Sequence, residues 1–127
     1  MAHEQILIVD DNPTNLKLAR VLLTGEGYDV KTAVDAEEAL NLLKTLKPQL
    51  ILMDIQLPGM DGLTLTKLIK SDPEKKSILI IALTAYVMKG DDQKALAAGC
   101  DGYIPKPIDT NTLPTLLVEY LKKSKST

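Results

Sequence analysis

The chain has 127 residues and a formal net charge of −2; 45% of its residues are hydrophobic and 25% are charged. These values are ordinary for one globular domain and give no electrostatic attraction to nucleic acid or to an anionic membrane. No apolar run is long enough to cross a bilayer, the first residues lack the features of a signal peptide, and the single cysteine excludes an internal disulfide. We therefore expect one cytoplasmic domain over residues 1–127, with a core from about residue 5 to 123 and a disordered C-terminal tail.

The first half of the chain predicts two strand–helix pairs and a third strand. Residues 5–9 form an apolar run typical of a strand buried on both faces, and a helix with leucines at helical spacing follows it. Residues 28–33 are rich in β-branched residues but include two charged ones, which indicates an edge strand. A helix that begins at Asp35 and includes Leu46 in its apolar face leads to another fully apolar run, residues 50–53.

The second half continues the alternation of strands and helices. In chain order it predicts a helix from Asp61 to the residue before Pro73, a strand over 77–83, a short helix up to Ala98, a strand over 101–104 and a helix over about 112–123. Strands and helices that alternate through short connections form right-handed crossovers and a parallel sheet. We predict a doubly wound α/β fold of the flavodoxin-like type, with a five-stranded sheet in the order 2-1-3-4-5 and helices on both faces.

Polar residues follow four of the five predicted strands. Asp10 and Asp11 follow the first, Asp54 the third, Thr84 ends the fourth and Lys106 comes after the fifth. Because the carboxyl ends of parallel strands meet at one rim, these residues are expected to lie together. Three carboxylates repel one another, so a hard cation such as Mg²⁺ is expected between them. The lysine and the hydroxyl complete a pocket for a phosphoryl group carried by Asp54, since carboxylates do form acyl phosphates.

Each of these residues, taken alone, has an ordinary structural interpretation. The acidic pair could cap the first helix, Thr84 could bond to backbone at a strand end, and Lys106 could be a solvated loop lysine. Their convergence at one rim favours a functional site instead.

The same segments resemble the receiver domain of two-component response regulators over essentially the whole chain. The matching segments are residues 8–12 (IVDDN), 52–62 (LMDIQLPGMDG), 82–85 (ALTA) and 106–107 (KP). Two further stretches, 88–91 and 99–103, are most similar to small stand-alone receivers of the cell-division-control type and to the receivers of hybrid sensor kinases.

The resemblance implies a phosphoryl-accepting site. Asp54 would take the phosphoryl group from a phosphohistidine on a sensor histidine kinase or a histidine phosphotransfer protein. Asp11, Asp54 and the backbone carbonyl of Gln56 would bind Mg²⁺ directly, and Asp10 would bind it through water. Lys106 would pair with the phosphoryl oxygens.

The resemblance also implies a switch. Thr84 would move to bond the phosphoryl group and Tyr103 would rotate inward behind it. The face formed by the fourth helix, the fifth strand and the fifth helix would then meet an unknown protein target. Such a protein catalyses only its own phosphorylation and dephosphorylation and is not otherwise an enzyme.

Three other functions fit the sequence less well. A phosphatase with an aspartyl nucleophile usually needs a second aspartate two residues later, where this chain has Gln56. A receiver-like binding module that is never phosphorylated would not need the acidic pair or Lys106. A flavin carrier of the same fold would need aromatic stacking, and the chain contains no Trp or Phe. No basic segment follows the last helix, so output passes through protein contact or the chain is part of a longer protein.

Overall fold

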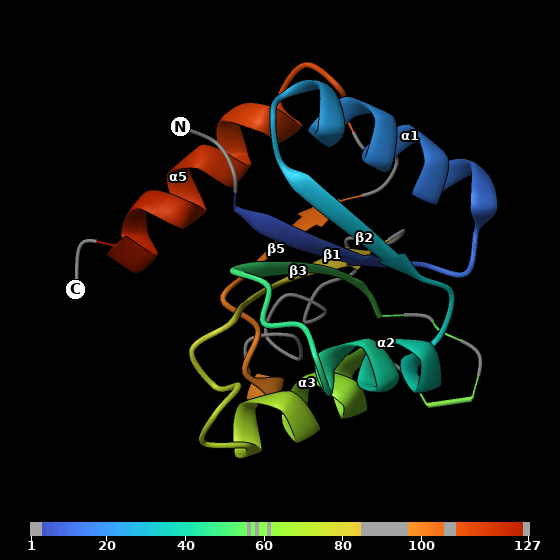
Figure 1. Cartoon of the computed structure of the whole chain (residues 1–127), viewed down its shortest axis with the longest axis vertical. Helices are drawn as coiled ribbons and strands as arrows, with labels where there is room; N and C mark the ends of the chain where they lie inside the picture. Colours follow the sequence, from blue (N-terminus) through green and yellow to red (C-terminus); the bar gives the residue numbers. More distant parts are fainter. Residues whose placement is uncertain are drawn as a thin grey trace.

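The computed structural model describes residues 4–55, 57, 59–60, 62–84, 97–105 and 109–125 (Figure 1). In chain order, the helices and strands are β1 (Gln5–Val9), α1 (Pro13–Gly25), β2 (Asp29–Ala33), α2 (Ala36–Leu43), β3 (Leu50–Asp54), α3 (Gly62–Ser71), β4 (Leu79–Thr84), β5 (Gly102–Pro105) and α5 (Leu113–Lys125). The strands form one parallel sheet in the order β2-β1-β3-β4-β5. This arrangement confirms the predicted α/β fold, its strand order and the edge position of β2.

The core has two layers, one on each face of the sheet. Figure 1 shows α1 and α5 covering one face and α2 and α3 the other. Side chains of β3 alternate between these layers: Leu50 and Leu52 join the cluster with α1 and α5, whereas Ile51 and Met53 join the cluster with α2 and α3. Because both faces are covered, the inner strands need apolar residues at every position, which explains the unbroken apolar runs in the sequence.

Side-chain caps fix the first turns of α1 and α2. The Asn12 side chain accepts hydrogen bonds from the backbone N–H groups of Thr14 (2.9 Å) and Asn15 (3.2 Å), and Asp35 accepts one from Glu38 (2.8 Å). These caps satisfy donors that have no partner within the helix. The cap at Asp35 confirms the predicted start of α2.

Several element bounds differ from the prediction. Helix α2 ends at Leu43, so Leu46 lies in the loop that follows and not in the helix. Strand β4 begins at Leu79, two residues later than predicted. Helix α5 continues to Lys125 and includes two residues of the tail that we expected to be disordered. Most of the short helix predicted before Ala98 lies outside the described residues. Among the helices that are described, none is long and apolar enough to span a membrane.

Paired polar groups hold the amino-terminal ends of β4 and β5 together. The Nζ atom of Lys70, near the end of α3, lies 2.9 Å from the Asp101 carboxylate and donates to the carbonyl oxygens of Lys76 (3.1 Å) and Ile78 (2.8 Å). The same Asp101 carboxylate accepts the backbone N–H of Ile80 at 2.9 Å. This network, called here the Lys70–Asp101 clamp, also uses the backbone of residues 76–78, which explains why β4 starts late.

Cys100 lies directly before the clamp and is 5% exposed. Burial is the main cause that raises the pKa of its thiol, partly offset by the contact of its Sγ atom with the Thr66 hydroxyl at 3.8 Å. The cysteine therefore packs in the core as a small hydrophobic side chain.

Candidate metal centre

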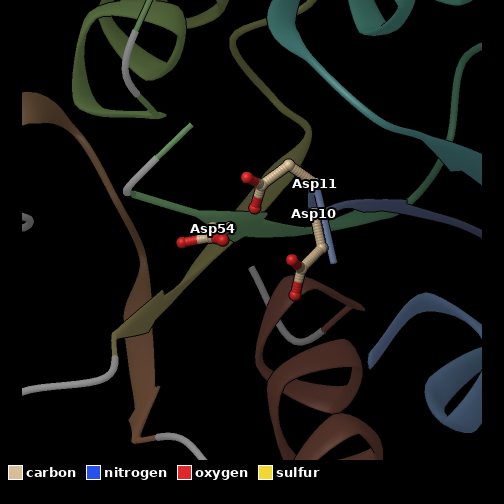
Figure 2. A group of neighbouring side chains, drawn as sticks. All are labelled: Asp10, Asp11 and Asp54. Atoms are coloured by element: carbon tan, nitrogen blue, oxygen red, sulfur yellow. The ribbon is translucent and has the colours of Figure 1, made fainter. Parts of the chain in front are cut away.

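Three carboxylates meet at the carboxyl ends of β1 and β3. Asp10, Asp11 and Asp54 each offer an oxygen, and these oxygens all lie within 4.8 Å of one another. Figure 2 shows the three side chains converging from the two strand ends. The sheet brings them together because β1 and β3 are neighbours in a register that pairs Val9 with Met53, so that the next residue of each strand falls at the same rim. The sequence prediction that Asp10, Asp11 and Asp54 converge is confirmed.

The two aspartates after β1 differ in burial. Asp10 is 1% exposed; its N–H donates to the carbonyl of Ala33 (3.1 Å), and its Oδ1 atom accepts the N–H of Asn12 (2.9 Å). Asp11 is exposed. Asp10 is therefore held by the turn that leads into α1, while Asp11 faces solvent.

Asp54 ends the central strand and is 4% exposed. Its strand pairs with β4 in a register that sets Asp54 beside Leu83, and the N–H of Ile55 donates to the carbonyl of Leu83 at 3.2 Å. On the other side, the N–H of Gly62 donates to the carbonyl of Ile55 at 3.2 Å. Backbone hydrogen bonds with β4 and with the start of α3 thus hold Ile55, the residue directly after Asp54.

The donor set fits a hard divalent cation. Carboxylate oxygens are the ligands that Mg²⁺ prefers, and the ion is usually held by one or two of them together with waters. Two of the three carboxylates are buried, and bringing like charges together inside a protein is costly unless a cation compensates them. The cluster therefore offers suitable oxygen ligands for such an ion, and the ion would reduce the repulsion between the carboxylates.

The other predicted site residues are described only in part. Thr84 ends β4, where its backbone lies beside Pro105 of β5, but its side chain is outside the described atoms. Tyr103 lies on β5, is partly buried and packs against the core layer of α2 and α3. Gln56 and Lys106 lie outside the described residues, so their parts in the site stay predictions.

One residue of the site was missed by the sequence prediction. Gly62, the residue after the predicted helix start at Asp61, packs directly on the backbone of Asp54. The available signal was a glycine at the start of a helix, where ordinary residues are better helix formers.

Comparison with known families and curated proteins gives one consistent result. Residues 6–118 match the family model described as the response regulator receiver domain. The chain is 42% identical over 118 residues to a polar-differentiation response regulator, DivK, from Brucella anthropi, a match that covers 93% of this chain and 96% of the relative.

Solved structures agree with that result. A putative response regulator from Chloroflexus aurantiacus has a TM-score of 0.90 and 32% identity, covering 94% of this chain and 98% of that one. A chemotaxis response regulator from Vibrio cholerae has a TM-score of 0.88 and 28% identity, covering 93% and 98%. The receiver domain of a sensor histidine kinase from Pseudomonas aeruginosa has a TM-score of 0.86 and 33% identity, covering 95% and 99%; that structure holds a magnesium ion coordinated in its active-site cleft.

Proposed function

The chain belongs to the response regulator receiver family, and from this premise we propose that Asp54 accepts a phosphoryl group and that Asp10, Asp11, Asp54 and the carbonyl of Gln56 hold the Mg²⁺ ion that supports the transfer. The observation that carries the proposal is the meeting of the three carboxylates within 4.8 Å. The magnesium ion in the related Pseudomonas aeruginosa receiver supports the choice of metal. When bound, Mg²⁺ would offset the negative charge that gathers between the carboxylates and the phosphoryl oxygens.

Asp54 is proposed as the nucleophile because it ends the central strand beside Asp10 and Asp11, and because the next residue, Ile55, is held by β4 and by the start of α3. An Asp54 carboxylate oxygen forms a bond to phosphorus while the phosphorus–nitrogen bond of the donor phosphohistidine breaks. The electron pair of that bond returns to the imidazole, which takes up a proton. The donor is a sensor histidine kinase or a histidine phosphotransfer protein.

Lys106 and Thr84 are proposed to receive the transferred group. The pairing of Thr84 with Pro105 supports this assignment, because it sets the end of β4 beside the residue that precedes Lys106. An ammonium and a hydroxyl are suitable partners for phosphoryl oxygens, and charge-assisted hydrogen bonds of this kind contribute about 1.5–3 kcal/mol each. These bonds form only after transfer, so they can drive a change of shape.

We propose that this change passes through Thr84 and Tyr103 to the face formed by β5, α5 and the predicted helix before Ala98. The face would then bind a protein target in the cytoplasm. The likeness to a polar-differentiation response regulator, which matches 93% of this chain, supports a role in signalling. The protein would thus be a signalling switch and not an enzyme acting on other substrates.

The test is phosphorylation by a small acyl phosphate with Mg²⁺, followed by intact mass measurement and peptide mapping. The wild-type chain should gain one phosphoryl group on Asp54, and Asp54→Asn should gain none. Asp101→Asn is the matched control, because it makes the same chemical change in the Lys70–Asp101 clamp and should keep phosphorylation. A phosphoryl group on another residue, or none on the wild type, would overturn the proposal. Steady hydrolysis of phosphate esters would favour the phosphatase alternative.

A further inference from the structure

Gly62 lies closer to the Asp54 backbone than any residue with a side chain could. It is buried, begins α3 and donates its N–H to the carbonyl of Ile55 at 3.2 Å. A Cβ atom at this position would lie 2.7 Å from the Cα of Ile55 and 3.0 Å from the carbonyl carbon of Asp54, and nearer still to the Asp54 carbonyl oxygen. All three atoms belong to the backbone, so none can rotate away.

Other glycines in the described part of the chain differ in this respect. A Cβ at Gly25 would meet nothing within 4 Å. At Gly99 and Gly102 the nearest atoms belong to the side chains of Lys70 and Tyr120, which have rotatable bonds. A methyl group at residue 62 would instead have to move the strand end itself.

The strand end that would move is the one that carries the Asp54 carboxylate. The N–H of the peptide after Asp54, which belongs to Ile55, donates to the Leu83 carbonyl, and the carbonyl of Ile55, one peptide further on, accepts the Gly62 N–H. The first turn of α3 is itself fixed, because the buried Thr66 hydroxyl donates to the carbonyl of Gly62 at 2.8 Å. The start of α3 is thus fixed directly against the backbone next to the Asp54 carboxylate.

We propose that Gly62 is a positioning residue of the phosphoryl-accepting site. By lacking a side chain, it lets the first turn of α3 dock on the Asp54 backbone, and this docking places the carboxylate at the distance from Asp10 and Asp11 that metal binding and phosphoryl transfer require. The inference rests on the function proposed above. A displacement of about 1 Å in a reacting group can lower a rate about 100-fold.

The experiment compares Gly62→Ala with Gly25→Ala, which adds the same methyl group where there is space. Without metal, the amide NMR signals of Ile55 and Leu83 should shift in Gly62→Ala only. Mg²⁺ should bind this variant about 10-fold more weakly or worse. The initial rate of phosphorylation by a small acyl phosphate, expressed per folded molecule, should fall about 100-fold. Gly25→Ala should match the wild type in all three measurements.

A purely structural role predicts a different result. In that case Gly62→Ala would unfold at lower urea concentration, but its folded molecules would bind Mg²⁺ and accept phosphoryl groups like the wild type, and the proposal would be overturned. If the wild type itself is not phosphorylated, the proposed function fails, while the NMR and Mg²⁺ comparisons still decide whether Gly62 positions Asp54.

A second variant covers the case in which Gly62→Ala does not fold. Thr66→Val removes the hydrogen bond that fixes the carbonyl of Gly62 and adds no atom next to Asp54. Like Gly62→Ala, it should lower both the Mg²⁺ affinity and the phosphorylation rate, but by a smaller factor than Gly62→Ala does. Wild-type values for both in folded Thr66→Val would then overturn the proposal.

Discussion

The two ends of the sheet both carry polar side chains next to the core, but they combine charges in opposite ways. At the carboxyl end, three aspartates bring oxygens within 4.8 Å of one another. At the amino end, Lys70 meets Asp101 at 2.9 Å, and the same two side chains bond to backbone groups of the adjacent loop and strand. An ion pair between opposite charges, as at the amino end, stabilises the fold. A cluster of like charges, as at the carboxyl end, indicates a site for a ligand of opposite charge.

Hydrogen bonds at the amino end also join neighbouring strands. The N–H of Gln5 donates to the Gln49 side chain at 2.8 Å, and the Gln5 side chain donates to Asp29 at 3.1 Å. These residues begin β1, precede β3 and begin β2, so the interactions tie the starts of three strands. The following experiments test this division between a structural end and a functional end.

The largest effect is expected from magnesium at the carboxyl end. Mg²⁺ at 100 times its dissociation constant should raise the free energy of unfolding of the wild type by about 2.7 kcal/mol. Asp11→Asn should lose most of this gain and, without metal, should be more stable than the wild type because one like charge is gone. Urea unfolding with and without Mg²⁺ measures both effects. An Asp101→Asn variant that responded to Mg²⁺ as weakly as Asp11→Asn would break the comparison.

The next largest effect is expected from the Lys70–Asp101 clamp. Asp101→Ala removes the acceptor used by Lys70 and by the N–H of Ile80, so the free energy of unfolding should fall by about 2 kcal/mol. Asp101→Asn keeps an acceptor and should lose less. Urea unfolding gives the stability, and a Mg²⁺ titration of the folded variants should match the wild type. A clear loss of Mg²⁺ affinity in either variant would show that the two ends are coupled.

A smaller effect concerns alkaline pH and the buried thiol of Cys100. Because burial raises its pKa, the folded chain keeps the thiol proton at a pH where the unfolded chain has lost it. Stability should therefore be fully present below the ordinary thiol pKa of about 8.5 and should fall by up to about 1.4 kcal/mol per pH unit above it. Urea midpoints measured between pH 7.5 and 9.5 should show this slope in the wild type and a flatter one in Cys100→Ala. Equal slopes would contradict the assignment to Cys100.

The smallest effect tests a structural residue that lies within the functional end. Asn12→Ala removes the side-chain cap of α1 and should cost about 1 kcal/mol of unfolding free energy. Its backbone N–H, which holds Asp10, remains, so Mg²⁺ affinity should not change. Urea unfolding and a Mg²⁺ titration measure the two quantities. A fall in affinity equal to that of Asp11→Asn would make Asn12 part of the metal site.

The sequence was sufficient for the features that depend on local pattern and on the rules of parallel sheets. Apolar runs located β1, β3 and β4, and β-branched residues located β2. Alternation with helices indicated a parallel sheet, and the flavodoxin-like fold type supplied the strand order that places Asp54 beside Asp10 and Asp11. The cap at Asn12 was also predictable, because asparagine before proline is a typical helix start.

Features that depend on long-range contact could not be predicted in this way. Lys70 and Asp101 are far apart in the sequence, and nothing in their own neighbourhoods indicates that they meet. The late start of β4 is related to that contact, because the Ile78 carbonyl accepts a hydrogen bond from Lys70. The close approach of Gly62 to Asp54 is likewise a property of packing between a helix and a strand, which periodicity does not report.

The neighbouring positions of β1 and β3 have a consequence for biosynthesis. β1 and β3 are neighbours in the sheet, but α1, β2 and α2 lie between them in the chain. Asp54 therefore emerges from the ribosome well after Asp10 and Asp11. A nascent chain that ends before β3 carries only part of the donor set and gains little from the cation. The cluster of three carboxylates therefore forms only when the central strand has been made and inserted into the sheet.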